Sequence, residues 1–248
     1  MFKLVKYELR KQLFSKVVIL TLLALLEIGF LVGLFTENND ILATSAGLFI
    51  FLSIVTVCFV AFESIFTFSN DLKTKQSYML FLTPNSTYKI VGAKILTSML
   101  TIIVTAAAFL AVILLNVTIA LAKYEMIGDF VKVIQEFMKQ MMNAEVNYAL
   151  VIAYVCYIVF NLIRILIVGM TSITLSATFL SNTKVKGIVS VAFFFGINYL
   201  TSKLASLLIP SLTAFDTTPF YYHCLWTLGV VGVFYLLTSF MLDKKVSV

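Results

Sequence analysis

Charged residues, proline and histidine are all scarce in this chain of 248 residues. Only 12% of the residues are charged, three are proline and one is histidine. Soluble domains carry about 25% charged residues, so a chain this poor in charge cannot present an ordinary water-facing surface. Hydrophobic residues make up 61% of the sequence, and the mean hydropathy is +1.03. We therefore predict an all-α integral membrane protein whose solvent is the lipid bilayer.

Missing motifs exclude several kinds of site. No GxxxxGK[ST] loop is present to hold nucleotide phosphates on backbone N–H groups, so any ATP must be hydrolysed on another chain. A zinc hydrolase of the HExxH kind needs two histidines, and His223 is the only one. The three cysteines are an odd number and lie in or beside apolar runs, so no disulfide framework is expected. The net charge of +6 is modest and gives no reason to expect nucleic-acid binding. We expect no catalytic, cofactor or metal site on this chain.

Long apolar runs divide the chain into six expected membrane spans within one transmembrane domain, residues 1–248. The spans cover residues 17–35, 41–68, 95–122, 148–180, 187–209 and 223–242. A helix needs about 20 residues to cross a bilayer, so the long second and fourth runs must tilt or protrude. The first run contains Glu27 and no small-residue cleavage site, so it is expected to remain as a span.

Two flanking segments are expected to lie at the membrane surface, and a third is expected to re-enter the membrane. Residues 1–16 alternate an apolar and a basic helical face, which favours an interfacial helix over a disordered basic flank. Residues 123–147 have an apolar stripe and a charged stripe with an expected Lys132–Glu136 pair, so we predict an external helix on the membrane. Residues 203–222 contain two prolines and are predicted to form a re-entrant pair of short helices.

The orientation follows from the distribution of lysine and arginine. Most of the 18 basic residues fall in segments that six spans would place together with the N-terminus: 1–16, 73–94, 184–186 and 244–245. Because the excess of Lys and Arg marks the cytoplasmic side, we predict that both termini lie inside.

The connection between the second and third spans is a polar elbow. Ser69-Asn70-Asp71 is predicted to start a helix, since a short acceptor side chain can satisfy free N–H groups of the first turn. The helix is expected to run over 72–82 and to stop at Thr83-Pro84, because proline restrains the residue before it and lacks an N–H. Ser86 or Thr87 is expected to cap the third span.

The elbow resembles the first cytoplasmic loop of type-2 ATP-binding-cassette (ABC-2) exporter permeases. The resemblance is carried by Asp71, Lys73/Lys75, Leu80-Phe81, Thr83-Pro84, Ser86 and Gly92-Ala93-Lys94. In that family the loop is a coupling helix that sits in a groove of the ATPase subunit. The resemblance therefore implies a coupling role for Asp71, Leu72, Lys73, Lys75, Tyr78, Leu80, Phe81 and Pro84, with Asn182, Lys184 and Lys186 in the second cytoplasmic loop.

The same resemblance implies the partners. Family members work as twelve-span dimers with two ATPase subunits, so a six-span chain implies a second copy, identical or paralogous. ATP and Mg would be bound by the ATPase, and the expected location is the cytoplasmic membrane of a bacterial cell. Small permeases of this length resemble those that export, or give immunity to, amphipathic peptides, bacteriocin-like toxins or lipophilic antibiotics.

Phenylalanine, with 23 residues, marks a candidate substrate path. Phe59, Phe62 and Phe66 lie in the second run, and Phe193, Phe194 and Phe195 lie in the fifth. Lipid contact or core packing also explains such residues. In the ABC-2 family these two spans line the route between the permease copies, so the resemblance implies a greasy lateral path for hydrophobic or amphipathic cargo.

Three ionisable residues fall inside spans: Glu27, Glu63 and Arg164. Each costs roughly 3 kcal/mol at the bilayer centre on insertion scales, so Arg164 is expected to pair with Glu63 or Glu27. The pair is either a fixed brace between helices or a contact remade during transport.

Two other classes of function stay open. An ion- or proton-coupled secondary transporter would use these three charges, and its transport would survive without an ATPase but collapse with the proton gradient. A membrane-embedded enzyme or assembly protein is the third class, for which the sequence offers no convergent catalytic set.

Overall fold

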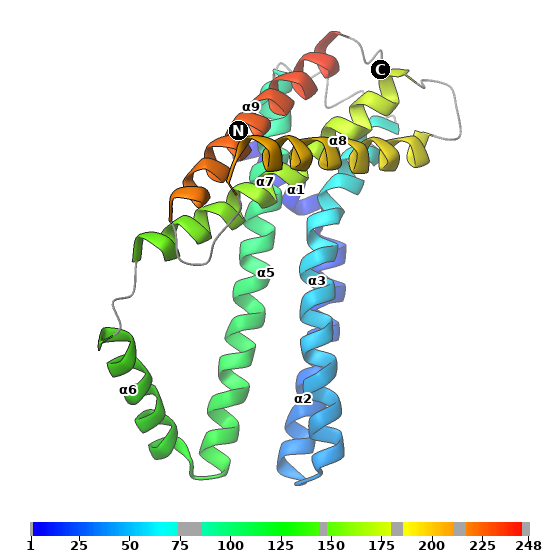
Figure 1. The fold of residues 1–248 in the computed structure, drawn as a ribbon. Helices are drawn as coiled ribbons and strands as arrows, with labels where there is room; N and C mark the ends of the chain where they lie inside the picture. The colour runs from blue at the N-terminus through cyan, green and yellow to red at the C-terminus, as the bar shows by residue number, and fades with distance from the viewer. Residues whose placement is uncertain (1, 74–85, 144–147, 180–185, 211–216, 245–248) are drawn as a thin grey trace. The chain divides into compact units, whose positions relative to one another are not determined.

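The computed structural model describes residues 2–73, 86–143, 148–179, 186–210 and 217–244, and every regular element among them is an α-helix. The helices are α1 (Phe2–Lys11), α2 (Leu13–Phe35), α3 (Asn39–Lys73), α5 (Thr87–Lys123), α6 (Ile127–Asn143), α7 (Tyr148–Phe179), α8 (Lys186–Leu208) and α9 (Thr217–Lys244) (Figure 1). Six of them, α2, α3, α5, α7, α8 and α9, are long and apolar enough to cross a membrane. The predicted all-α fold and the six candidate spans are confirmed.

Exposed side chains on the long helices are largely apolar. Leu25 on α2 is 61% exposed, Phe51 on α3 is 65% exposed and Leu225 on α9 is 65% exposed. Apolar surface on this scale would drive aggregation in water, whereas lipid tails solvate it well. The protein is therefore a multi-pass membrane protein.

The chain divides into two compact units, and α1, α3 and α5 each contribute residues to both. One unit contains Met1–Lys6, Ala61–Met99 and Asn147–Val248. The other contains Tyr7–Val60 and Leu100–Val146. We call them the 61–99/147–248 unit and the 7–60/100–146 unit.

Within the 7–60/100–146 unit, α2 and α3 are joined by a three-residue turn (Figure 1). Glu37 adopts a left-handed φ of 56°, and the N–H of Asn38 donates to the carbonyl of Gly33 at 3.1 Å, which is the Schellman arrangement of a helix end. The Asn38 side chain then accepts hydrogen bonds from the N–H groups of Asp40 and Ile41 and so caps α3. One short segment thus ends one helix and begins the next.

The end of α5 is fastened to the end of α2 by Lys123. Its ammonium group donates to the carbonyl of Leu34 and lies 3.4 Å from Glu37 Oε1. Carbonyl groups in the last turn of a helix lack intrahelical partners, and a lysine satisfies one of them favourably. Past Lys123 the chain repeats the Schellman arrangement, with Glu125 at φ 56° and Met126 donating to Leu121 at 3.0 Å.

Within the 61–99/147–248 unit, α7 is the central helix. Its residues Ile167, Val168, Met170 and Ile173 form a buried core with Phe68 of α3, Val91 of α5 and Leu242 of α9. The α7 and α9 helices are also joined by a hydrogen bond of 2.7 Å between the hydroxyls of Thr171 and Thr238. Small and hydroxyl side chains at such contacts let membrane helices approach closely and hydrogen-bond across the interface.

Two predicted boundaries near helix starts are wrong. The amphipathic N-terminal segment ends at Lys11, and residues 13–16 already belong to α2 rather than to a helix over 1–16. No helix starts at Ser69-Asn70-Asp71, because α3 runs through these residues to Lys73. Asp71 is engaged by Lys94, so its carboxylate binds a neighbouring helix instead of capping a new one.

The predicted pair of short re-entrant helices is also wrong for the described residues of 203–222. Residues 203–208 continue α8, and residues 217–222 form the beginning of α9, so the sixth apolar helix starts earlier than predicted. Pro219 lies in the first turn of α9, where its missing N–H breaks no intrahelical bond. Within α6, Lys132 pairs with Asp129 at 3.1 Å, and the predicted partner, Glu136, is not its ion-pair partner.

Candidate functional site

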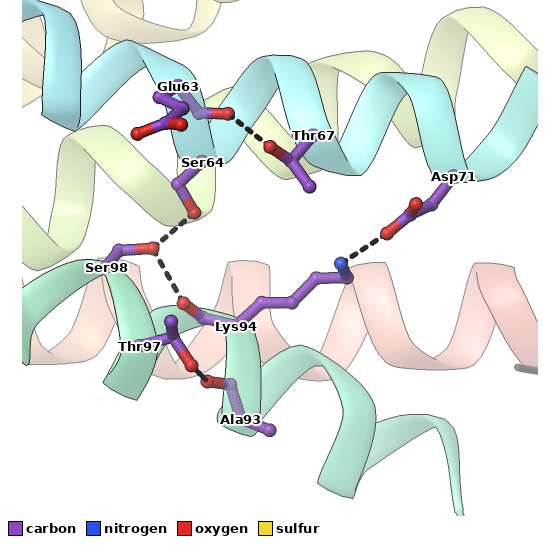
Figure 2. Close-up of polar contacts among 8 residues, drawn as sticks. All are labelled: Glu63, Ser64, Thr67, Asp71, Ala93, Lys94, Thr97 and Ser98. Atoms are coloured by element: carbon purple, nitrogen blue, oxygen red, sulfur yellow. Dashed lines mark hydrogen bonds and ion pairs between the residues drawn. The ribbon is translucent and has the colours of Figure 1, made fainter. Parts of the chain in front are cut away.

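The last turn of α3 and the second turn of α5 are joined by a buried ion pair. Lys94 Nζ lies 2.5 Å from Asp71 Oδ2, and the two side chains are only 3% and 6% exposed. Figure 2 shows the lysine stretched along α5 until its ammonium group reaches the carboxylate on α3. The aromatic ring of Phe68 lies 5.9 Å from the same ammonium group, where its electron-rich face favours a cation.

The energetics of this pair make it a rigid connection. Two buried charges lose their hydration, and only close contact and further hydrogen bonds compensate that loss. Separating Asp71 from Lys94 would move each charge away from a close counter-charge in a buried region, where charges interact more strongly than in water. The two helix ends are therefore expected to move together.

A second contact joins the same helices further along. The hydroxyls of Ser64 on α3 and Ser98 on α5 are hydrogen-bonded, and Ser98 also donates to the carbonyl of Lys94 at 2.6 Å (Figure 2). Both serines are buried, and their small size permits close approach of the helices. The helices on either side of residues 74–85 are thus held together by two contacts, the Asp71–Lys94 ion pair and the Ser64–Ser98 hydrogen bond.

The predicted coupling residues are only partly described. Asp71 is placed as above, and Leu72 packs against the core formed by Phe68, Val91 and α7. Lys73 is the last residue of α3. The Lys73 side chain lies outside the described part of the structure, as do Lys75, Tyr78, Leu80, Phe81 and Pro84.

One residue of the predicted second cytoplasmic loop, Lys186, lies beside the end of α3. Lys186, the first residue of α8, borders a small cavity of about 30 Å³ together with Ser69 and Leu72 of α3 and Ser176 of α7. Asn182 and Lys184 lie outside the described residues. At the same end of this unit, the Tyr235 hydroxyl of α9 donates to the carbonyl of Tyr88 on α5 at 2.7 Å. The end of α3, the starts of α5 and α8 and the last part of α9 therefore lie close together.

The predicted phenylalanine path divides into exposed and packed residues. Phe59, Phe62 and Phe66 on α3 are 49%, 47% and 66% exposed. On α8, Phe195 is exposed, whereas Phe194 packs against the core of its unit. Phe193, the remaining member of the set, is half-buried. Exposed rings of this kind are available to lipid, to a second copy or to cargo.

The intramembrane charges have the following neighbours. The Asn116 side chain donates to Glu27 Oε2 at 3.0 Å within the 7–60/100–146 unit. Glu63 is half-buried, and its backbone carbonyl accepts the Thr67 hydroxyl. Arg164 is half-buried on α7, and its hydrogen bonds in the described part of the chain all go to neutral side chains. The expected pairing of Arg164 with Glu63 or Glu27 is not among them.

Sequence reasoning missed the partners that hold these charges. Asn161 lies three residues before Arg164 on α7, and Asn198 and Thr201 lie three apart on α8. Polar side chains at a spacing of three within apolar runs share one helix face, and this spacing was the available signal. Among the described residues no group of three His, Cys, Asp or Glu side chains could hold a metal ion.

Comparisons of the chain with protein-family models, with curated proteins and with solved structures found no match.

Proposed function

We propose that this chain is the membrane-spanning permease subunit of an ATP-driven exporter of the ABC-2 type. The observation that carries the proposal is the buried Asp71–Lys94 pair, which joins the two helix ends on either side of residues 74–85. A force applied to that connection would act on α3 and α5 together rather than bend one of them. The six long apolar helices supply the span number that such a subunit needs.

The position of Lys186 supports the same function. It borders a cavity with Ser69 and Leu72, beside the end of α3. An ATPase docked on residues 74–85 would therefore also be close to the start of α8. Movement of the ATPase could then reach α7 and α8 through this contact and reach α3 and α5 through the ion pair.

The proposal specifies orientation and partners. Both termini and residues 74–85 face the cytoplasm, where two ATPase subunits bind ATP and Mg²⁺. A second permease copy, identical or paralogous, completes the transporter in the cytoplasmic membrane of a bacterial cell. The cargo is hydrophobic or amphipathic, because the phenylalanines on α3 and α8 offer it an apolar surface.

The test is purification of the full chain from its native membrane in mild detergent. The expected result is a stoichiometric nucleotide-binding subunit and ATP hydrolysis that vanadate inhibits. The double variant Leu80→Asp/Phe81→Asp should lose that subunit, because two carboxylates would have to be buried in its groove.

Val133→Asp is the matched control. It places a carboxylate on α6 at a position that is 61% exposed and next to the charged stripe, so the ATPase should stay bound. A purified chain that transports cargo with no associated ATPase contradicts the proposal. Retention of the ATPase by the double variant refutes the docking role of these two residues.

A further inference from the structure

Arg164 faces a cavity that lies among α7, α8 and α9. The cavity has a volume of about 310 Å³ and lies entirely within the 61–99/147–248 unit. Its polar lining includes Asn161, Thr201, Ser202, Ser206, His223 and Thr227. No Asp or Glu is among the described residues that line it. Among the described residues that line it, the cavity therefore mixes polar and apolar side chains and has one permanent charge, the guanidinium of Arg164.

Within the described part of the chain, the hydrogen bonds of Arg164 all go to neutral acceptors. Nε donates to Asn161 Oδ1 at 3.0 Å, and Nη1 donates to Asn198 Oδ1 at 2.9 Å and to Thr201 Oγ1 at 3.2 Å. These neutral acceptors fix the orientation of the guanidinium group. Its other terminal nitrogen, Nη2, makes no hydrogen bond in the described part of the chain. Arginine has two terminal nitrogens that bind carboxylate or phosphate oxygens well.

A charge within a membrane span normally faces protein, water or a counter-charge. Within the described residues no counter-charge is in contact with Arg164, although Asn161, Asn198 and Thr201 hold its side chain in place. Such an arrangement holds the cation ready for an anion that comes from outside the chain. Three fixed neutral partners also reduce the entropy that the arginine would lose on binding.

An apolar hollow adjoins the Arg164 cavity. It is lined by Leu208, Ile209, Pro210, Tyr222 and Trp226 and has a volume of about 430 Å³. Ile209, Pro210 and Trp226 line both spaces, so the two spaces are direct neighbours. A ligand that fills both would need a charged head next to a hydrocarbon body.

We propose that the Arg164 cavity and the adjoining hollow bind an anionic amphiphile. Its carboxylate or phosphate contacts the guanidinium of Arg164, and its hydrocarbon part lies against Trp226 and Leu208. The carboxylate of a lipophilic acid and the phosphate of a membrane lipid share this chemistry. The site does not depend on the proposed exporter function, because binding needs neither ATP nor a partner subunit.

Trp226 supplies a direct readout because it is the only tryptophan of the chain. The purified full chain is placed in nanodiscs of zwitterionic lipid, and its tryptophan fluorescence is titrated with 9,10-dibromostearate, whose bromines quench nearby indole. The uncharged control is the methyl ester of the same acid. A second arm compares brominated phosphatidic acid with brominated phosphatidylcholine and separates a lipid phosphate from a free carboxylate.

We expect saturable quenching by at least one of the two anionic probes at a concentration about tenfold lower than its control without net charge requires. Arg164→Gln should remove that difference, whereas Arg164→Lys should retain part of it. Lys203→Gln is the matched control, because it removes one positive charge from an exposed position on α8 outside the cavity lining. The probes should quench the fluorescence of this variant as they quench that of the unchanged chain.

Two results would overturn the proposal. One is equal quenching of the unchanged chain by the charged and uncharged probes of both arms. The other is a preference for the anion that persists in Arg164→Gln. If that variant does not fold, as judged by its thermal unfolding in detergent, the comparison of charged with uncharged probes on the unchanged chain decides the matter.

Discussion

Lys94 Nζ lies 2.5 Å from Asp71 Oδ2, although the two residues are 23 positions apart and belong to different helices. The contact is almost fully buried, which distinguishes it from the ion pair of Asp129 and Lys132 on α6, whose side chains are both 74% exposed. The chain therefore contains one buried and one exposed Asp–Lys pair, and the exposed pair can serve as a control for the buried one.

Removing one partner of the buried pair should destabilise the protein strongly. Asp71→Asn or Lys94→Met leaves the other charge buried without its partner, which costs roughly 3–5 kcal/mol. The swap Asp71→Lys/Lys94→Asp should recover part of that loss. The measurement is thermal unfolding in detergent, followed by size-exclusion chromatography.

The exposed pair provides the control for that experiment. Asp129→Asn should change stability by less than about 1 kcal/mol, because exposed ion pairs contribute little. Equal losses of stability in Asp71→Asn and Asp129→Asn would show that burial does not strengthen the contribution of the Asp71–Lys94 pair to stability.

Gly33 should tolerate no side chain. A Cβ at this position would lie 2.7 Å from the backbone nitrogen of Leu42, where α2 and α3 pack closely beside their turn. Backbone cannot move aside as a side chain can, so Gly33→Ala should cost about 1–3 kcal/mol. Gly47→Ala on α3 has open space around it and should be neutral or stabilising. Comparable unfolding temperatures for the two variants would contradict the close approach.

Gly169 on α7 should be a milder case with a specific rescue. A Cβ there would lie 2.5 Å from Cδ1 of Ile65, which is the end of a flexible side chain. Gly169→Ala should therefore destabilise less than Gly33→Ala, and Ile65→Val should restore part of the loss because valine lacks that atom. The readout is a double-mutant cycle of unfolding temperatures. Additive effects of the two changes would show that these residues do not touch.

The orientation predicted from the distribution of lysine and arginine can be tested by cysteine labelling. In a variant with Cys58, Cys156 and Cys224 replaced by alanine, a cysteine is introduced at exposed Ser86 or at exposed Met126. A membrane-impermeant maleimide should label Met126→Cys in intact cells and Ser86→Cys only after the membrane is opened. Labelling of Ser86→Cys in intact cells would show that the orientation is opposite to the predicted one.

Much of the fold could be predicted from the sequence, because apolar runs long enough for a bilayer have few other uses. The six runs became six long helices whose positions agree with the prediction to within several residues. The boundaries were less predictable. The sequence Ser69-Asn70-Asp71 has the composition of a helix start, yet Lys94 binds the aspartate and α3 continues.

The site was harder to predict than the helices, since it depends on pairs of residues that are distant in sequence. The sequence shows that Arg164 needs a partner but does not say whether that partner is a carboxylate or the amide of Asn198. Helix packing decides this choice, because Asn198 and Thr201 occupy the α8 face that meets α7. The periodicity of polar residues within one helix does not show which face of a neighbouring helix it will contact.

The most direct test of the central claim is photocrosslinking from position 81 in living cells. Benzoylphenylalanine in place of Phe81 should crosslink to a protein that carries a GxxxxGK[ST] loop and is labelled by azido-ATP. The same group in place of Val133 should not. If an ATPase docks on residues 74–85, efficient crosslinking to it should occur from Phe81 alone. No crosslink from Phe81, in a protein that remains folded and active in transport, would contradict docking of an ATPase on residues 74–85.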